Sequence, residues 1–208
     1  MNDEKLLEEG KILPLVEEFY TLQGEGYNTG KAAYFIRIGG CDIGCKWCDS
    51  KFSWNPELHK TVNVDEIVKN AASQPAKAIV VTGGEPLNYN LDYLCIELKK
   101  QKVETFLETA GNKPLTGEWD WICLSPKKNN PPLLDIYKKA NELKVIIYSI
   151  EDFEWAEEAA KQVRNECILY LQPEWSMYNK IIHQTVSYIK NNPKWKISLQ
   201  SHKFMNIP

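Results

Sequence analysis

Short apolar runs alternate with amphipathic stretches along most of the chain, and this alternation limits the possible folds more than any other feature of the sequence. The runs, such as residues 78–82, are rich in β-branched side chains and predict buried strands. The stretches between them, such as residues 89–100, place Leu91, Leu94 and Leu98 on one helical face. Strands are predicted at 33–38, 78–82, 103–107, 119–124, 143–147, 167–171 and 195–199. Helices are predicted at 64–72, 89–100, 132–141, 152–164 and 177–191.

Strands separated by helices predict right-handed crossovers and a parallel sheet, so the expected fold class is α/β. A chain of 208 residues holds about six or seven such βα units, fewer than the eight of a closed TIM barrel. We therefore expect a single domain over residues 1–208, built as a partial, open TIM-like barrel. Polar and glycine-bearing segments directly follow the predicted strands. Because the carboxyl ends of parallel strands share one edge, a functional site is expected there.

The composition is that of an ordinary globular protein, and it excludes several classes. The formal net charge is −3, so no basic field favours nucleic-acid binding. No apolar run approaches the roughly 20 residues of a membrane span, and the acidic N-terminus lacks the apolar core of a signal peptide. We therefore expect a cytoplasmic protein. In that reducing compartment, six cysteines indicate metal or redox chemistry rather than disulfides.

Three cysteines stand in one glycine-bearing polar loop directly after the predicted strand 33–38. Cys41, Cys45 and Cys48 follow the spacing C-x3-C-x2-C. A structural zinc site normally uses four ligands, often two cysteine pairs, and this chain has no second pair. Three thiolates can instead hold a [4Fe–4S] cluster and leave one iron open to a ligand. A zinc site and three reduced cysteines without metal are the alternatives. The other cysteines are isolated within apolar runs, at Cys95, Cys123 and Cys167.

The cysteine loop resembles that of the radical S-adenosylmethionine (SAM) superfamily. Trp47 stands just before the third cysteine, where the superfamily pattern has an aromatic residue. The resemblance implies a radical SAM core, in which the open iron binds the amine and carboxylate of SAM. Electron transfer from the cluster then cleaves SAM and yields a 5′-deoxyadenosyl radical.

Segments after later predicted strands support this resemblance. Gly83-Gly84-Glu85-Pro86 follows the strand at 78–82 and is similar to the superfamily segment that grips the methionyl ammonium. A plain turn is the alternative for this segment, and solvated loops are the alternative for the others. The other segments follow the third, fourth and sixth predicted strands; they contain Glu108, Ser125, Pro126, Lys127 and Gln172.

Three further features indicate the kind of substrate. Gln23 and Glu25, in residues 20–26, offer donors and acceptors for a flat heterocycle with amide-like and guanidine-like edges, although a glycine turn is the alternative. Arg37 can bind a substrate carboxylate bidentately, or it can point outward into a surface ion pair. Ser50 follows the last cysteine of the loop, and its hydroxyl can ligate Mg²⁺.

Together these residues resemble the 7-carboxy-7-deazaguanine synthase family of queuosine and deazapurine biosynthesis, over nearly the whole chain. The resemblance implies a lyase that converts 6-carboxy-5,6,7,8-tetrahydropterin to 7-carboxy-7-deazaguanine and releases ammonia. It implies a [4Fe–4S] cluster, SAM that is regenerated in each turnover, and Mg²⁺. It also implies a homodimer and an electron donor such as flavodoxin or ferredoxin.

The resemblance also implies roles for individual residues. The cluster ligands would be Cys41, Cys45 and Cys48. The cofactor-binding residues would be Trp47, Cys48, Asp49, Gly84, Glu85, Glu108, Ser125, Pro126, Lys127 and Gln172. The substrate-binding residues would be Leu22, Gln23, Gly24, Glu25, Arg37, Thr82, His202 and Pro208. The Mg²⁺ ligand would be Ser50.

The chain departs from the family pattern at two positions. Ser50 stands where the family usually has a threonine, and it lacks the methyl group that restricts rotation. Ala110 replaces a common asparagine, so one side-chain contact is lost. The apolar tail that ends at Pro208 is expected to pack back and bring its carboxylate to the pterin. A disordered end is the alternative.

Two other functions compete with this interpretation. A glycyl-radical-enzyme activase is also a short member of the superfamily, but it acts on a protein backbone and has no need of the segment from Gln23 to Gly26. A non-catalytic iron–sulfur or zinc-binding module, for electron transfer or RNA, is a rival of another class. An all-cysteine cluster would need a fourth cysteine nearby, and RNA binding would favour a basic patch with aromatic residues.

Overall fold

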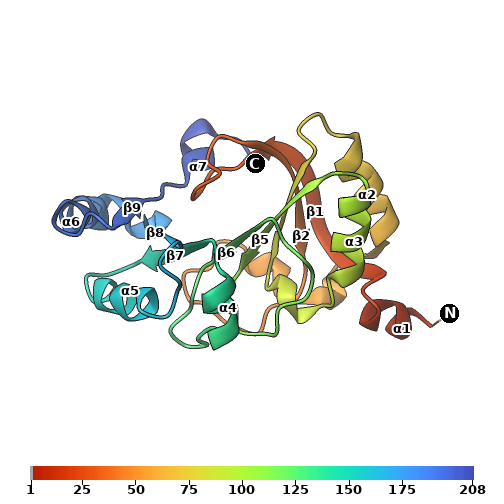
Figure 1. Ribbon diagram of the computed structural model, residues 1–208, viewed down its shortest axis with the longest axis horizontal. Coiled ribbons are helices and arrows are strands. Elements are labelled where there is room, and N and C mark those ends of the chain that lie inside the picture. The colour runs from red at the N-terminus through yellow and green to blue at the C-terminus, as the bar shows by residue number, and fades with distance from the viewer. Residues whose placement is uncertain (1) are drawn as a thin grey trace.

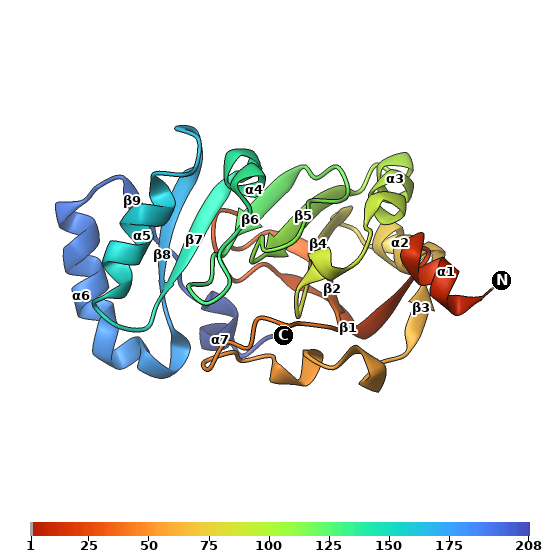
Figure 2. The same cartoon turned by 90° about the horizontal axis from the view of Figure 1, so that it is seen from below.

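The computed structural model describes residues 2–208, and nine strands of this part of the chain form one sheet. The strand order is β3-β1-β2-β4-β5-β6-β7-β8-β9 (Figure 2). Neighbouring strands from β2 to β9 are parallel, whereas β1 is antiparallel to both β2 and β3. The strands are β1 (Ile12–Leu22), β2 (Ala32–Ile38), β3 (Thr61–Asn63), β4 (Ala78–Gly83), β5 (Glu104–Thr109), β6 (Trp121–Leu124), β7 (Glu142–Ile147), β8 (Ile168–Pro173) and β9 (Trp195–Ile197).

All of the predicted strands are present, as β2 and β4 to β9, with small shifts at their ends. The sheet curves, but its two outer strands, β3 and β9, do not pair with each other (Figure 1). The predicted α/β fold with an open, partial barrel is therefore confirmed.

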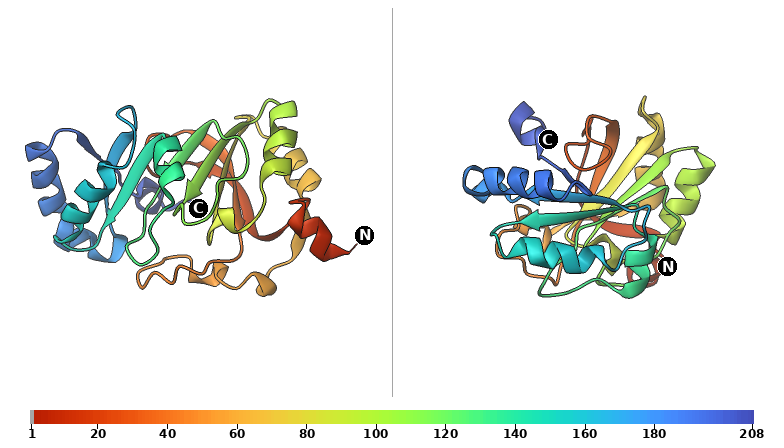
Figure 3. Two further views of the ribbon diagram at one scale, coloured as in Figure 1. Left: turned by 60° about the horizontal axis from the view of Figure 1, so that its bottom comes forward. Right: turned by 60° about the vertical axis from the view of Figure 1, so that its left-hand side comes forward.

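Helices α2 to α6 cover one face of this sheet. Figures 1 and 3 show α4 and α5 on one side of the sheet, and α7 with the C-terminus on the other. The helices are α1 (Asp3–Glu8), α2 (Val64–Ser73), α3 (Asp92–Lys100), α4 (Leu134–Lys139), α5 (Asp152–Ala160), α6 (Tyr178–Asn191) and α7 (Ser201–Met205). Short 3₁₀ helices lie at Lys51–Ser53, Pro56–Leu58, Pro86–Asn88 and Trp175–Met177.

Each predicted helix is present, although α3, α4 and α5 are shorter than predicted. Helix α2 begins at Val64, as predicted. Asn63 caps this end, because its side chain accepts a hydrogen bond from the Asp65 backbone N–H. The predicted helix at 132–141 shrinks to α4 because the chain becomes extended at Leu133 and leaves the helical conformation at Ala140.

Four elements were not predicted: α1, β1, β3 and α7. The longest of them is β1, whose pairing with β2 shifts register between Leu15 and Glu17. Such a bulge interrupts the alternation of buried and exposed side chains, which is the sequence signal of a strand. The predicted first strand, at 33–38, is thus the second strand of the protein.

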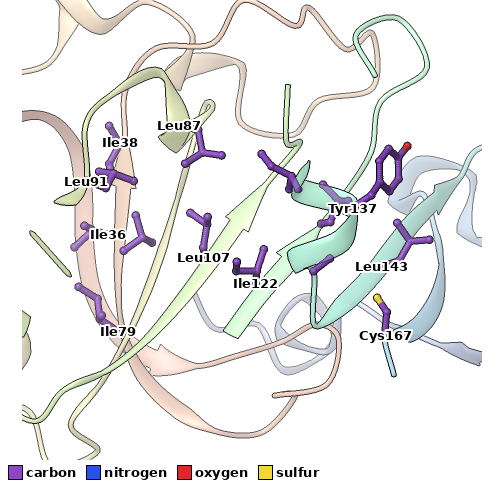
Figure 4. Packing of buried hydrophobic residues seen from close by; sticks show 14 of the residues in the cluster. Ile36, Ile38, Ile79, Leu87, Leu91, Leu107, Ile122, Tyr137, Leu143 and Cys167 are labelled. Atoms are coloured by element: carbon purple, nitrogen blue, oxygen red, sulfur yellow. The ribbon is translucent and has the colours of Figure 1, made fainter. Parts of the chain in front are cut away.

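The core lies mainly between the sheet and its helices (Figure 4). On β4, Ile79 and Val81 belong to this large cluster. The alternate residues Ala78 and Val80 belong to a smaller cluster with Phe106. Because both faces of β4 are buried, its sequence is a continuous apolar run, as is usual for parallel strands.

No helix within residues 2–208 has the length and apolar character required to cross a membrane. Helix α1 lies at one end of the molecule, whereas the C-terminus lies next to the curved sheet (Figure 3).

Candidate active site

One cleft joins the carboxyl edge of the parallel strands to the face of the sheet opposite α2–α6, which we call the inner face. Almost every site residue predicted from the sequence lines this cleft. They are Leu22, Gln23, Gly24, Glu25, Arg37, Cys41, Cys45, Trp47, Cys48, Asp49, Ser50, Thr82, Gly84, Glu85, Glu108, Ser125, Lys127, Gln172, His202 and Pro208. The exception is Pro126, which lines an adjoining pocket that shares Cys45 and Trp47 with the cleft.

The cysteine loop follows β2 at the carboxyl edge of the sheet. The Cys41 N–H donates to the Trp54 carbonyl at 3.1 Å, and the Cys48 N–H donates to the Cys45 carbonyl at 3.2 Å. All three thiols are half-buried and line the cleft. Burial raises the pKa of the Cys41 and Cys45 thiols, so these groups are protonated at neutral pH until a metal displaces the proton.

The donor set of this loop fits an iron–sulfur cluster. Within residues 2–208, no three His, Cys, Asp or Glu side chains converge on a position for one metal ion. In a [4Fe–4S] cubane each thiolate binds a different iron, so thiols spaced around a loop suit a cluster and need not converge. The other three cysteines, which stand within apolar runs of the sequence, are buried in the core; they are Cys95, Cys123 and Cys167.

The loop after β4 packs directly against the cysteine loop. The Gly84 N–H donates to the Ile38 carbonyl at 2.9 Å, and the Glu85 N–H donates to the Gly40 carbonyl at 2.8 Å. A Cβ atom on Gly84 would lie 2.4 Å from the Gly40 carbonyl oxygen, which is too close for any side chain. Glycine at position 84 is therefore what allows the two loops to touch.

The Glu85 carboxylate fastens this loop to the end of β5. It accepts hydrogen bonds from the Thr109 hydroxyl at 2.5 Å and from the Ala110 N–H at 2.8 Å, and a third from the Leu87 N–H at 3.1 Å. Burial raises the pKa of Glu85, although these donors oppose the rise. A carboxylate has about four acceptor positions, so one remains for a cationic ligand. The predicted contact with the methionyl ammonium stays a prediction.

Lys127 and Ser125 follow β6 on the other side of the cysteine loop. The Lys127 ammonium donates to the Ser125 hydroxyl at 2.8 Å and lies 5.7 Å from the centre of the Trp47 ring. Burial lowers the pKa of Lys127. These groups place a hydroxyl, an amine and an aromatic ring in the cleft that the cysteines line, and their predicted contacts with SAM stay a prediction.

The inner face of the sheet supplies the second wall of the cleft. Its polar side chains lie within strands and not after them: Arg37 is on β2, Thr82 on β4, Glu108 on β5, Lys144 on β7 and Gln172 on β8. Arg37 and Thr82 are direct partners in the parallel register of β2 and β4. The site therefore continues from the predicted edge into the concave interior of the open barrel.

The sequence left two roles open for Arg37: binding a substrate carboxylate or forming a surface ion pair. The structure is compatible with both. Its Nε lies 2.7 Å from a Glu17 carboxylate oxygen, so the ion pair is present. The side chain is only about one-fifth exposed, at 21%, and still lines the cleft. Its contact with a substrate carboxylate stays a prediction.

Two half-buried carboxylates and one buried ammonium form a connected charged group in the cleft. The Lys144 Nζ lies 2.6 Å from a Glu25 oxygen and 2.9 Å from a Glu108 oxygen. Burial opposes ionisation of Glu25, but the adjacent ammonium outweighs it and holds the pKa of Glu25 at about 2. Burial raises the pKa of Glu108, which Lys144 only partly offsets. We call Glu25, Glu108 and Lys144 the carboxylate wall. It combines a firmly ionised acid, Glu25, with an acid that binds a proton more readily, Glu108.

The segment containing Gln23 and Glu25 enters the cleft from the opposite edge of the sheet. It follows β1, and Leu22 at the end of β1 pairs with Ala32 at the start of β2. The last part of the chain then packs on it, because the Ser201 N–H donates to the Gly24 carbonyl at 2.9 Å.

Gly24 lies against His202, the only histidine predicted to contact substrate. A Cβ atom on Gly24 would lie 2.1 Å from the His202 Nδ1. Glycine is therefore required where the two segments meet. Burial lowers the pKa of His202, which favours the neutral imidazole in the cleft.

Asp49, Ser50 and Pro208 complete the rim of the cleft. The Ser50 hydroxyl lies 3.6 Å from the Cys48 sulfur, and Asp49 forms an ion pair of 2.8 Å with Lys203. Pro208 lines the same cleft, which agrees with the expectation that the tail packs back. The proposed Mg²⁺ ligation by Ser50 stays a prediction.

Several cleft residues were absent from the predicted site, and two of them, Lys144 and Gln200, contact Glu25. Lys144 lay hidden inside the apolar run 143–147, although a lone charge alternating with buried positions was an available signal. Gln200 donates from its amide to Glu25 at 2.9 Å, and no local pattern in the sequence indicates this contact.

Comparison with known proteins identifies the family. Residues 35–166 match the model of the radical SAM superfamily. The chain is 56% identical to the 7-carboxy-7-deazaguanine synthase of Flavobacterium psychrophilum, over 97% of this chain and 96% of that protein. It is 46% identical to the enzyme of the same name from Synechocystis, over 93% of each chain.

A solved structure gives the same result. The crystal structure of QueE from Escherichia coli matches with a TM-score of 0.83 and 26% identity, over 97% of this chain and 99% of that chain. Full-length similarity in sequence and fold, together with a cysteine loop and a carboxylate wall in one cleft, makes this chain a member of the 7-carboxy-7-deazaguanine synthase family within the radical SAM superfamily.

Proposed function

We propose that this chain converts 6-carboxy-5,6,7,8-tetrahydropterin to 7-carboxy-7-deazaguanine and ammonia, as a lyase of queuosine and deazapurine biosynthesis. Its relatives carry the name of this activity. The substrate contains the atoms and electrons of both products together, so the reaction consumes no net oxidant. The observation that carries the proposal is the pair of carboxylates, Glu25 and Glu108, in the same cleft as the cysteine loop.

The chain uses a [4Fe–4S] cluster and SAM, the cofactors of its superfamily. When bound, these cofactors supply reversible abstraction of a hydrogen atom. Cys41, Cys45 and Cys48 hold the cluster through their thiolates. The proposed SAM-binding groups are Trp47, Asp49, Gly84, Glu85, Ser125, Pro126, Lys127 and Gln172. Glu108, which the sequence assigned to SAM, is reassigned to the pterin because it shares Lys144 with Glu25.

The carboxylate wall binds the guanidine-like edge of the pterin. Glu25 and Glu108 accept hydrogen bonds from ring N–H groups, and Gln23 complements the amide-like edge. Arg37 binds the substrate carboxylate. Ser50 would hold Mg²⁺, which would supply a Lewis acid for that carboxylate. Glu108, whose pKa is raised by burial, is the wall residue best suited to take up a proton during loss of ammonia. The other substrate contacts are Leu22, Gly24, Thr82, His202 and Pro208.

Several properties extend the proposal to the whole protein. Residues 1–208 act as a single domain in the cytoplasm and form a homodimer. A small electron carrier such as flavodoxin or ferredoxin reduces the cluster. The substrate is a small molecule, and neither nucleic acid nor a membrane is a partner.

The decisive experiment is an anaerobic assay of reconstituted protein with SAM, Mg²⁺, a chemical reductant and the carboxypterin. We expect formation of 7-carboxy-7-deazaguanine and an equal amount of ammonia, with many turnovers for each SAM consumed. Omission of SAM is the control and should abolish product. A protein that cleaves SAM but leaves the pterin intact would favour the glycyl-radical-enzyme activase instead. A protein that leaves both SAM and the pterin intact would favour a non-catalytic module.

A further inference from the structure

Lys144 lies at the centre of the carboxylate wall, on the inner face of β7. The residue is only 4% exposed, yet its ammonium lies within hydrogen-bonding distance of two side chains that line the cleft. It is 2.6 Å from a Glu25 oxygen and 2.9 Å from a Glu108 oxygen. One cation on the middle of a strand thus links an acid that follows β1 to an acid on β5.

The remaining oxygen of each carboxylate is held by an amide. Gln200 Nε2 donates to Glu25 Oε1 at 2.9 Å, and Gln23 Nε2 donates to Glu108 Oε1 at 3.2 Å. Each carboxylate is therefore fixed at both oxygens, and its plane cannot rotate freely. Since a carboxylate oxygen has two acceptor positions, each retains one for a ligand in the cleft.

We propose that Lys144 is a positioning residue for the substrate: it holds Glu25 and Glu108 at the spacing and orientation that accept the N–H groups of a guanidine-like ring edge. This inference rests on the proposed function, and it assigns Lys144 an effect on the substrate through the two acids. Lys144 needs no contact of its own with the reacting atoms.

The charge balance explains why an ammonium is needed at this place. Two half-buried carboxylates in one cleft repel each other, and their partial burial disfavours both charges. Without the ammonium, at least one acid would take up a proton near neutral pH and present an O–H where the substrate needs an acceptor. Besides its own members Glu25, Glu108 and Lys144, the cluster is influenced by the titratable groups Cys123, Lys127, Glu142 and His202.

A purely structural role for Lys144 makes a different prediction. A buried ion pair contributes little net stability, because the cost of removing charges from water offsets their attraction. If Lys144 only compensated buried charge, its loss would lower stability, and substrate affinity would change equally at every pH. If it keeps both acids ionised for the substrate, the loss of affinity must be largest at low pH and must shrink as the pH rises.

The test compares Lys144→Met with Lys31→Met in the reconstituted holoenzyme. Lys31 also lies 2.6 Å from a carboxylate oxygen, that of Glu104, but this pair is outside the cleft. We measure KM for the carboxypterin between about pH 6 and pH 9 and divide each value by that of the parent protein. For Lys144→Met this ratio should be about tenfold or more at pH 7 and should fall towards high pH. For Lys31→Met it should stay within about twofold throughout.

Two further variants separate the effect of the Lys144 charge from a failure to fold. Lys144→Arg retains the charge, so its KM ratio should not depend on pH. If iron content and thermal unfolding show that Lys144→Met does not fold, Lys144→Gln is measured in its place. A KM ratio for Lys144→Met or Lys144→Gln that stays within about twofold, or that is equally raised at every pH, overturns the inference. Failure of the parent protein to turn over the pterin would instead reject the proposed function.

Discussion

At the scale of single residues, the surroundings decide what a cysteine does. Cys45 lies in the polar loop after β2 and lines both the cleft and the adjoining pocket. Cys95 lies in α3, is only 3% exposed, and burial raises the pKa of its thiol to about 12. A thiol with such a pKa remains protonated and behaves as a small apolar side chain.

Replacement of Cys45 should therefore lower the amount of bound iron, whereas replacement of Cys95 should not change it. Cys45→Ala should lose most of the bound iron and sulfide and all cleavage of SAM, because two thiolates cannot hold the cluster. Cys95→Ala should keep the iron content of the parent, at about four per chain. Iron and sulfide analysis after anaerobic reconstitution measures both. Equal iron contents in the two variants would contradict the assignment of the cluster to the loop.

At the scale of elements, helix α3 packs into the core, whereas a strand such as β7 packs with one face and lines the cleft with the other. Leu94 and Leu98 of α3 are fully buried in the core on the helix-covered face. On the inner face of β7, Lys144 and Ile146 line the cleft, while Leu143 and Val145 point into the core. Period-2 alternation thus gives each strand one side for packing and one for chemistry.

Substitutions on the buried and the exposed face of α3 should differ in their effect on stability. Leu94→Ala, at a fully buried position, should lower the free energy of unfolding by about 2–5 kcal/mol because it leaves a cavity. Ile96→Ala, at a position 53% exposed on the same helix, is the matched control and should change it by less than about 0.5 kcal/mol. Anaerobic urea unfolding provides both values. A similar loss in both variants would contradict the assignment of the core face.

At the scale of the whole molecule, the open sheet leaves room for the last part of the chain to return across the cleft. Lys203 of α7 forms a 2.8 Å ion pair with Asp49 of the cysteine loop, and Ser201 bonds to Gly24. One short helix therefore connects the cofactor side of the cleft to its substrate side. Asp49 is 63% exposed, so the ion pair is screened by water and adds little to stability.

Lys203→Met should consequently affect substrate binding more than folding. We expect KM for the pterin to rise about three- to tenfold, because α7 would no longer be held at the rim. The unfolding free energy should change by less than about 0.5 kcal/mol. Lys161→Met, which removes a 2.6 Å pair with Glu158 on α5, is the control and should leave KM unchanged. If both variants have the KM of the parent, α7 does not position the substrate.

The sequence by itself determined the features that depend on neighbouring residues. Alternating β-branched and amphipathic segments specified the parallel strands and their helices, because periodicity is a local property. The spacing of Cys41, Cys45 and Cys48 specified the cluster loop for the same reason. The strand β1 escaped prediction because its bulge breaks the period on which the signal depends.

Only the tertiary structure decided how the carboxylate wall is built. Lys144 meets Glu25 across 119 positions of sequence, and Gln200 meets the same acid across 175. No local pattern records these contacts, since they arise when a curved sheet brings its inner face, its far edge and its last helix to one cleft. Burial and the Lys144 ammonium together then set the charge states of the acids: burial raises the pKa of Glu108, and the ammonium holds the pKa of Glu25 at about 2.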